Sequence, residues 1–285
     1  MNDEKTYERY KEDYSQEYIR STWDMAIGLQ AVDGLEPSDY LKKLAEKNIR
    51  GEITNEEIES LLYTRYENQT PKEKELRIEE SDKIANQIQK LLKSKGFSFH
   101  VVTFKETHRV LFGGVYSFAG QFREYDFSKK EAILGGDSAI YASFRTISDI
   151  LKYDFDEERE KVYTNMTKEQ VIKNIARFTS AIWQVHPFEE GNTRTTAVFI
   201  ERYLNYKGFQ VDNSLFKDNS LYFRNALVRS NCENLHKGIR NEMLYLEHFF
   251  ENLLYKGSHS LRNRDLILPA VKEDMLEQKK KDVFI

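Results

Sequence analysis

A histidine, two acidic residues, a glycine, an asparagine and an arginine lie within nine positions in the stretch HPFEEGNTR, residues 186–194. Gly191, Asn192 and Thr193 are expected at the start of a helix, where unpaired backbone N–H groups and the positive end of the helix dipole attract anions. Arg194, on the first turn, could donate two hydrogen bonds to phosphate oxygens. The pattern therefore indicates a phosphate-binding loop.

The remaining polar side chains of this stretch add a metal ligand and a base. Glu190 would repel a phosphate unless a cation lay between them, so we interpret it as a Mg²⁺ ligand. His186, at the end of the preceding helix, could accept the proton of a hydroxyl nucleophile. Together these groups suggest nucleotidyl transfer onto a hydroxyl. A structural alternative explains the same residues as a capped loop, in which Glu190 pairs with Arg194 and His186 is hydrogen-bonded.

Helices on both sides must hold this loop in place. The segment at 167–185 begins with a capping-box pair, Thr167 and Gln170, and repeats apolar residues at helical spacing. Pro187 ends that helix, and a second one is expected from about Thr193 to Gly208. Helical spacing predicts further helices at 39–47, 55–65, 72–94, 105–117, 139–152, 218–230 and 238–256.

Residues 122–137, FREYDFSKKEAILGGD, break the helical pattern. They alternate aromatic and polar residues and then reach a basic turn and two glycines, so we expect a short β-hairpin there. The fold class is therefore predicted to be mainly all-α, with this one hairpin. The polar run at 67–75 suggests a boundary after a small N-terminal helical unit.

The overall composition limits the classes of function. The chain has 285 residues, 32% of them charged, and a net charge of −4, which gives no support for nucleic-acid binding. The single cysteine, Cys232, excludes an internal disulfide and suggests a reducing compartment. The first residues are polar, unlike a secretory signal, and no segment approaches the ~20 apolar residues of a membrane span. We therefore expect a cytoplasmic protein. Histidines other than His186 show no metal-ligand spacing, so we expect them to be structural.

The stretch HPFEEGNTR resembles the signature of the Fic family, His-Pro-Phe-x-acid-Gly-Asn-x-Arg, and matches every fixed position of it. Residues 111–134 resemble the helix, turn and hairpin flap of that family, and residues 219–231 resemble its later nucleotide-side helix. The resemblance covers about residues 98–256. It implies a helical Fic domain that uses Mg²⁺ to transfer AMP from ATP to a Ser, Thr or Tyr hydroxyl of a target protein or of the enzyme itself.

The resemblance also implies a role for each motif residue. His186 would be the general base and Glu190 the Mg²⁺ ligand, while Arg194 would grip the β-phosphate. The anion hole would be formed by Gly191 and Asn192, with Thr193 beside them, and Phe188 would pack inward to hold the loop.

The resemblance also implies roles for four residues outside the motif. Lys129 and Lys130 would lie on the flap that docks a target segment, and Tyr222 and Asn225 would line the adenine pocket. Solvated lysines on a turn and an aromatic residue in the core explain these positions as well.

Two motif positions depart from the family pattern. Thr193 replaces the more common glycine. Ala197 stands where family members often have a second arginine, which usually meets the γ-phosphate and an inhibitory glutamate. The orientation of ATP and the usual form of inhibition therefore stay open.

Residues 26–53 resemble the small antitoxin that inhibits Fic toxins, here fused ahead of the enzyme. The usual inhibitory pattern is Ser or Thr, three residues, Glu, then Gly or Asn; aligned on Gly34, this chain has Leu29 and Asp33 instead. We expect incomplete restraint by the helix at 22–33, because Asp33 is short and has no arginine at position 197 to hold it. A simple helix end at Asp33 and Gly34 is the alternative.

The predicted organisation has four parts: a regulatory unit at 1–70, a connecting helix at 71–97, a Fic domain at 98–256 and a tail at 257–285. Besides AMP transfer, two functions stay open. One is a Fic enzyme with another donor or reaction, such as UMP or phosphocholine transfer, phosphorylation or AMP removal. The other is a nucleotide-binding protein without catalysis. Neither the target protein nor the oligomeric state follows from the sequence.

Overall fold

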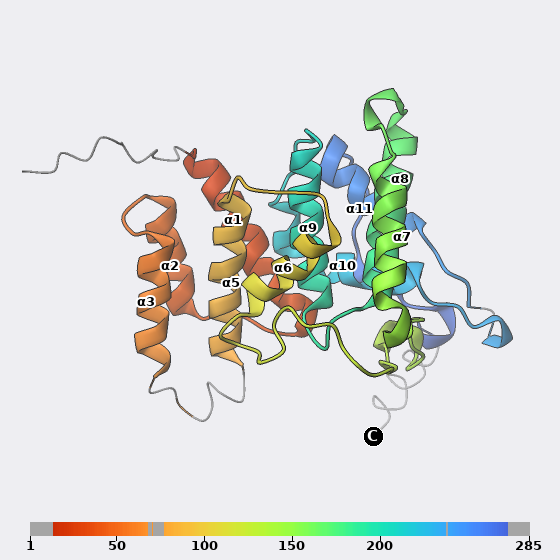
Figure 1. Ribbon diagram of the computed structural model, residues 1–285, viewed down its shortest axis with the longest axis horizontal. Coiled ribbons are helices and arrows are strands. Elements are labelled where there is room, and N and C mark those ends of the chain that lie inside the picture. Colours follow the sequence, from red (N-terminus) through yellow and green to blue (C-terminus); the bar gives the residue numbers. More distant parts are fainter. Residues whose placement is uncertain (1–13, 68–69, 71–76, 238, 273–285) are drawn as a thin grey trace, which may run out of the picture.

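The computed structural model describes residues 14–67, 70, 77–237 and 239–272, which form a layered set of helices (Figure 1). The α-helices are α1 (Gln16–Gly28), α2 (Asp39–Ile49), α3 (Asn55–Tyr66), α5 (Ile78–Lys93), α6 (Val101–Phe112), α7 (Ile147–Arg159), α8 (Lys168–Val185), α9 (Asn192–Tyr206), α10 (Leu215–Ser230), α11 (Leu244–Tyr255) and α12 (Asn263–Leu266). Short 3₁₀ helices include η1 (Leu29–Asp33), η2 (Ala132–Leu134) and η3 (Phe144–Thr146). The predicted helical fold class is confirmed.

Helix α9 forms the support for the motif loop. Residues 192–204 of this helix are all buried, and it packs against α5, α6, α8 and η1. A helix enclosed on all sides cannot shift without disturbing the core. Its first turn is therefore a fixed platform.

Helix α8 brings the chain to the motif as the sequence predicted. Thr167 Oγ1 accepts from the N–H of Gln170, and the Gln170 side chain accepts from the N–H of Thr167, which completes the capping box. The helix ends at Val185, because His186 adopts a left-handed conformation and Pro187 follows. The predicted range of 167–185 is confirmed to within one residue.

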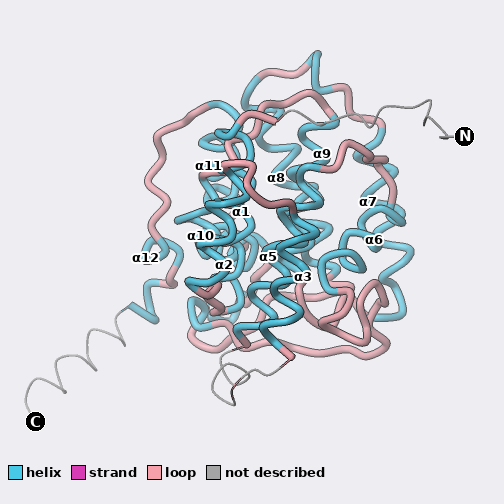
Figure 2. The backbone as a smooth tube through the Cα atoms, turned by 90° about the vertical axis from the view of Figure 1, so that its left-hand side faces the viewer, coloured by secondary structure: helices cyan, strands magenta, loops and turns pink. Residues whose placement is uncertain are grey.

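The β-hairpin expected at 122–137 is wrong. This segment is a loop with the 3₁₀ turn η2, and Figure 2 shows helices and loops but no strand within the described residues. The backbone N–H of Arg123 donates outside the segment, to the carbonyl of Pro187 at 2.8 Å, and that of Glu131 donates to the carbonyl of Asp137 at 2.9 Å, which closes the turn around η2. Two of the aromatic residues pack against the motif instead: the rings of Phe122 and Phe127 lie 5.6 and 5.5 Å from those of Phe188 and His186, whereas Tyr125 is exposed.

The N-terminal helices share their core with the rest of the molecule. Helix α1 packs against α5 and α10, and buried residues from Trp23 to Leu268 form one continuous cluster. Figure 1 shows α1, α2 and α3, in red and orange, beside α5. The expected boundary near residue 70 and the end of the C-terminal tail fall in residues 68–69, 71–76 and 273–285, outside the described residues. The four-part division stays a prediction.

None of the described helices combines the length and the apolar character that a membrane span requires.

Candidate active site

A cavity of about 280 Å³ opens beside the first turn of α9. It is lined by the motif loop, by the loop at 127–131 and by single side chains from η1, α8 and α10. The predicted site residues on its wall are Asp33, Lys129, His186, Glu190, Gly191, Asn192 and Thr193. The predicted site residues that do not line it are Gly34, Lys130, Phe188, Arg194, Tyr222 and Asn225. The fold thus brings the N-terminal region and the motif to one site.

His186 follows α8 with φ 46° and ψ 56°. This left-handed conformation is uncommon for a residue other than glycine, and Pro187 disfavours the helical alternative. The imidazole is buried and packs against the rings of Tyr141 and Trp183, with centroids 4.3 and 5.2 Å apart. Burial, reinforced by the charge of Lys129, lowers the pKa of His186 to about 3. The imidazole is therefore neutral at physiological pH, as a general base must be.

Arg123 holds the backbone around His186, and the sequence analysis missed it. Its buried guanidinium donates from Nε to the carbonyl of His186 at 2.8 Å, and from Nη2 to the carbonyls of Ala142 at 2.5 Å and Val185 at 3.2 Å. Its backbone N–H donates to the carbonyl of Pro187. One residue therefore fixes the end of α8 and the start of the motif. An arginine within an aromatic stretch gave no sign of this role, because it is equally typical of a solvated turn.

The first turn of α9 has the geometry of an anion site. Gly191 precedes it with φ 76°, and a Cβ there would lie 2.2 Å from the ring of Phe112. Only glycine fits both the backbone conformation and this close contact. No side chain caps the helix at Gly191, so its first N–H groups, which form the positive end of the helix dipole, have no capping side chain.

The side chains of the first turn stabilise the loop. Asn192 accepts from the N–H of Phe188 at 2.9 Å and donates to the carbonyl of Phe188 at 2.7 Å, which closes the loop on itself. Thr193 Oγ1 accepts from Trp183 Nε1 at 2.9 Å. The replacement of the more common glycine by threonine is therefore matched by a hydrogen bond to α8.

His108, on α6, fixes the loop at Glu190. Its Nδ1 accepts from the N–H of Gly120 at 2.8 Å, so Nε2 carries the proton and donates to the carbonyl of Glu190 at 3.0 Å. The imidazole stacks on Phe188 at 3.8 Å between centroids, and burial lowers the pKa of His108 to about 4. The sequence predicted a structural role for His108, and in the structure that role is to position the motif loop. The Glu190 side chain itself is exposed on the cavity wall.

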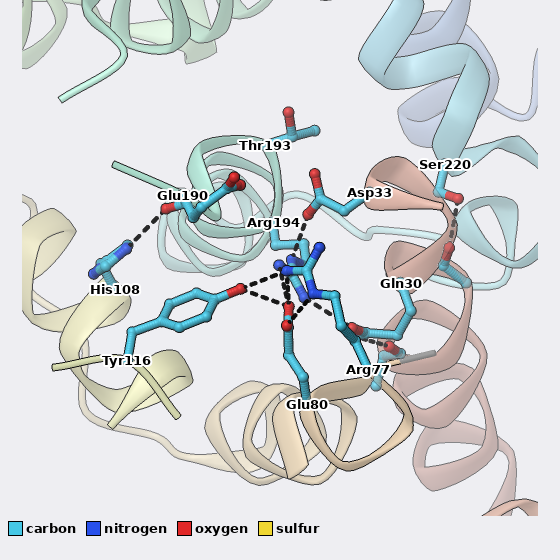
Figure 3. Close-up of polar contacts among 12 residues, drawn as sticks. Gln30, Asp33, Arg77, Glu80, His108, Tyr116, Glu190, Thr193, Arg194 and Ser220 are labelled. Atoms are coloured by element: carbon cyan, nitrogen blue, oxygen red, sulfur yellow. Dashed lines mark hydrogen bonds and ion pairs between the residues drawn. The ribbon is translucent and has the colours of Figure 1, made fainter. Parts of the chain in front are cut away.

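Arg194 does not line the cavity and is fully buried, with its guanidinium directed toward Asp33 and Glu80 (Figure 3). Its Nε lies 2.8 Å from Asp33 Oδ2 and its Nη2 3.1 Å from Glu80 Oε1. Its Nη1 donates to Gln30 Oε1 at 3.0 Å, and its guanidinium carbon lies 4.9 Å from the centroid of the Phe112 ring. Three polar side chains and an aromatic ring thus hold the guanidinium.

Two interpretations of the sequence are wrong at this point. Arg194 does not pair with Glu190, since its carboxylate partners are Asp33 and Glu80. Asp33 does have a guanidinium partner, because it reaches Arg194 although Ala197 is buried in α9 and offers none. Gly34 follows Asp33 with φ 70°, so the simple helix end considered as the alternative is formed as well.

Glu80, on α5, is held in place by its own partners. Arg77 donates to both of its carboxylate oxygens, at 2.6 and 2.7 Å, and the Tyr116 hydroxyl donates to Oε1 at 2.6 Å. Burial would raise the pKa of Glu80, but the bonds from Tyr116 and Arg77 and the charge of Arg194 together lower it below its usual range. The carboxylate is therefore ionised at neutral pH. Sequence reasoning missed Glu80, which lies far from the motif along the chain.

Tyr222 and Asn225 do not line the cavity. The Tyr222 hydroxyl donates to the carbonyl of Tyr245 at 3.2 Å, and Asn225 Nδ2 donates to Asn263 Oδ1 at 2.8 Å. The structure thus favours the alternative that Tyr222 is a core residue. Helix α10 contributes Arg224 to the cavity wall instead.

The two lysines expected on the flap differ in their position relative to the cavity. Lys129 lines the cavity, while Lys130 is exposed and does not line it. The same loop places Glu131 against Arg224, whose Nη2 lies 2.7 Å from Glu131 Oε2. This partly buried ion pair ties the loop to α10.

Comparison with known proteins finds a match to the Fic/DOC family over residues 98–204. A curated relative, the probable protein adenylyltransferase y4lH of Sinorhizobium fredii, is 28% identical over 134 residues, which cover 45% of this chain and 62% of the relative. The match therefore spans less than two thirds of that relative.

Two solved structures share the fold. The BepC protein of Bartonella tribocorum, with bound AMPPNP, superposes with a TM-score of 0.51 at 18% identity and covers 66% of this chain and 89% of its own. The N-terminal Fic domain of a Bartonella quintana effector, with bound ADP, gives the same score and identity and covers 66% and 87%. At this identity the likeness concerns the fold alone.

Proposed function

From the premise that residues 98–204 of this chain form a Fic/DOC domain, we propose that the protein transfers AMP from ATP to a Ser, Thr or Tyr hydroxyl of a target protein or of itself. The observation that carries this proposal is the arrangement of His186 and α9 around one cavity. A neutral base lies beside an uncapped helix N-terminus, so an acceptor hydroxyl and a phosphate can meet there.

Each group has a distinct task in the proposed reaction. His186 takes the proton of the acceptor hydroxyl, and the N–H groups of the first turn of α9 bind the donor phosphates. The hydroxyl oxygen bonds to the α-phosphorus, the bond between the α-phosphorus and the bridging oxygen to the β-phosphate breaks, and pyrophosphate leaves. Lys129 on the cavity wall adds positive charge. Holding the base and the phosphate in one cavity lowers the activation free energy, because a bimolecular encounter becomes an intramolecular step.

Glu190 is the residue that would hold Mg²⁺. Its side chain is exposed on the cavity wall, and its ordered backbone is fixed by His108. Among the described residues, no group of three or more His, Cys, Asp or Glu side chains is arranged to hold a metal. Mg²⁺ fits such a site, since it usually binds one or two carboxylates together with substrate phosphates. When bound, the ion would neutralise charge on the phosphates.

Restraint by the N-terminal region is part of the proposal. Asp33 lines the cavity and holds Arg194 at 2.8 Å, so a donor phosphate that needs this guanidinium has to replace the Asp33 carboxylate. The pair is buried on the arginine side, where such interactions are stronger than at an exposed surface. We therefore assign the restraint to the charge of Asp33 as well as to the packing of α1.

The test is incubation with α-labelled ATP, UTP, GTP and CTP, comparing the wild-type protein with His186→Ala. We expect labelling from ATP, a loss of about 10²–10⁴-fold in rate in the variant, and retained binding of Mg-ATP by calorimetry. Equal labelling by the variant would contradict the role of His186. Stronger labelling from another nucleotide would favour a different donor, and binding without labelling would favour a nucleotide-binding protein.

A further inference from the structure

Arg194 is neutralised by two carboxylates that come from different segments of the chain. Asp33 belongs to η1, whereas Glu80 belongs to α5 and lies on the other side of the guanidinium (Figure 3). Both lie outside residues 98–204, which match the Fic/DOC family. The cavity reaches Asp33 but not Glu80, so an incoming phosphate can replace only the first of the two.

The four charges of this cluster balance. Arg77 and Arg194 carry two positive charges, and Asp33 and Glu80 carry two negative ones. Glu80 divides its interaction between the two arginines, since Oε1 contacts Arg194 at 3.1 Å and Arg77 at 2.7 Å. If Asp33 leaves, Arg194 still faces an ionised carboxylate with little exposure to water, and that carboxylate lowers the positive potential that a phosphate meets.

We propose that Glu80 is a second restraining acid on Arg194, acting from α5 and independently of Asp33. The proposal rests on the proposed function, because it concerns the binding of a nucleotide phosphate by Arg194. It implies that displacement of the N-terminal region would release the site only in part. Full affinity for a nucleoside polyphosphate requires that the charge of Glu80 be drawn away from Arg194 too.

Glu80→Gln separates the charge of this residue from its other contributions. Glutamine keeps the shape and keeps an oxygen that can accept from Tyr116, Arg77 or Arg194, while the negative charge is lost. We expect Mg-ADP and Mg-ATP to bind about fivefold or more tightly to this variant in calorimetry on the full chain, which is within the usual range of coupling between charged sites. Glu79→Gln is the matched control, since Glu79 pairs with Lys83 on the same helix and does not contact Arg194. We expect wild-type affinity for it.

Arg77→Gln gives a second test with the opposite sign. Arg77 is partly exposed and takes up part of the charge of Glu80. Without it, Glu80 acts on Arg194 alone, so we expect weaker binding of Mg-ADP. If Glu80→Gln fails to fold, Arg77→Gln still tests the proposal. The Arg77 side chain is partly exposed, so its removal disturbs the core less.

The possible outcomes distinguish a failure of the restraint by Glu80 from a failure of the proposed function. Nucleotide binding that is unchanged or weaker in Glu80→Gln, or unchanged or tighter in Arg77→Gln, would overturn the second restraint and leave the proposed function standing. No binding of ATP, UTP, GTP or CTP by the wild type or by any variant would overturn both. Tighter binding in Glu80→Gln with weaker binding in Arg77→Gln would support the proposal, and the double variant Asp33→Asn/Glu80→Gln should then bind more tightly than either single one.

Discussion

The two ends of the motif at residues 186–194 are built in opposite ways. At one end, His186 is neutral, lines the cavity and has an Nδ1 without a hydrogen-bond partner among the described residues. At the other end, Arg194 is charged, fully buried and held by Asp33, Glu80 and Gln30. The base thus faces the cavity while the phosphate-binding cation is occupied.

This difference shows that a motif can match the family signature at every fixed position and still form a site in which one group, here Arg194, is already bound by other side chains. The acceptor side is fixed by contacts within residues 98–204, the range that matches the Fic/DOC family, chiefly from Arg123 and His108. The donor side depends on η1 and α5, which lie outside that range. In the proposed function, regulation would therefore act on the binding of the donor and leave the base unchanged.

The largest effect is expected for Arg194→Ala. This substitution leaves Asp33 without its partner and removes one of the cations that compensate Glu80. Breaking a buried ion pair by removing one partner typically costs about 3–5 kcal/mol of unfolding free energy. Urea denaturation of the variant would measure this loss.

The control for that experiment is Arg109→Ala. Arg109 is an exposed arginine on α6 that pairs with Glu106 within the same helix, so we expect a far smaller loss. Similar losses in the two variants would show that the cluster around Arg194 is no more than a surface ion pair, and the contrast between the two ends of the motif would fail.

The protonation of His186 tests the other end of the comparison. Because burial and the charge of Lys129 lower the pKa to about 3, the ring should stay neutral as the pH falls from 8 to about 5. A nitrogen-detected NMR titration of the imidazole would follow this directly. An ordinary histidine would gain a proton with a midpoint near 6.5, about the model-peptide value.

The sign of this shift also has a consequence for stability. A depressed pKa in the folded state means that the unfolded chain binds the proton first, so the contribution of His186 is complete above the unfolded pKa and is lost as the pH falls toward the folded one. A titration midpoint at 6 or above would contradict the buried, neutral base.

The sequence predicted the parts of the fold that depend on local signals. The capping box at Thr167, the end of α8 before Pro187 and the glycine at 191 could all be identified, because each depends on neighbours within a few residues. The hairpin at 122–137 failed, because alternation of aromatic residues cannot tell a paired strand from a loop packed on the motif.

The long-range partners of the site could not be predicted in the same way. Nothing in the sequence around Glu80 indicates that it meets Arg194, since 114 positions separate them and the contact depends on how α5 packs on α9. The same holds for Arg123, whose role consists of bonds to backbone carbonyls that any residue type could offer. The partner of Asp33 could not be identified from the motif pattern either, because the pattern places the partner arginine at position 197, whereas the packing of η1 on α9 brings Asp33 to Arg194.

The most direct test of the account is the affinity of Asp33→Asn for Mg-ADP, measured by calorimetry on the full chain. Asparagine keeps the size of the side chain and removes the charge that competes with a phosphate for Arg194. Asp24→Asn is the control, because Asp24 lies on α1 and pairs with Lys217 near the surface. The account predicts binding about tenfold tighter than wild type for Asp33→Asn and no change for Asp24→Asn. Wild-type or weaker affinity in Asp33→Asn would contradict it.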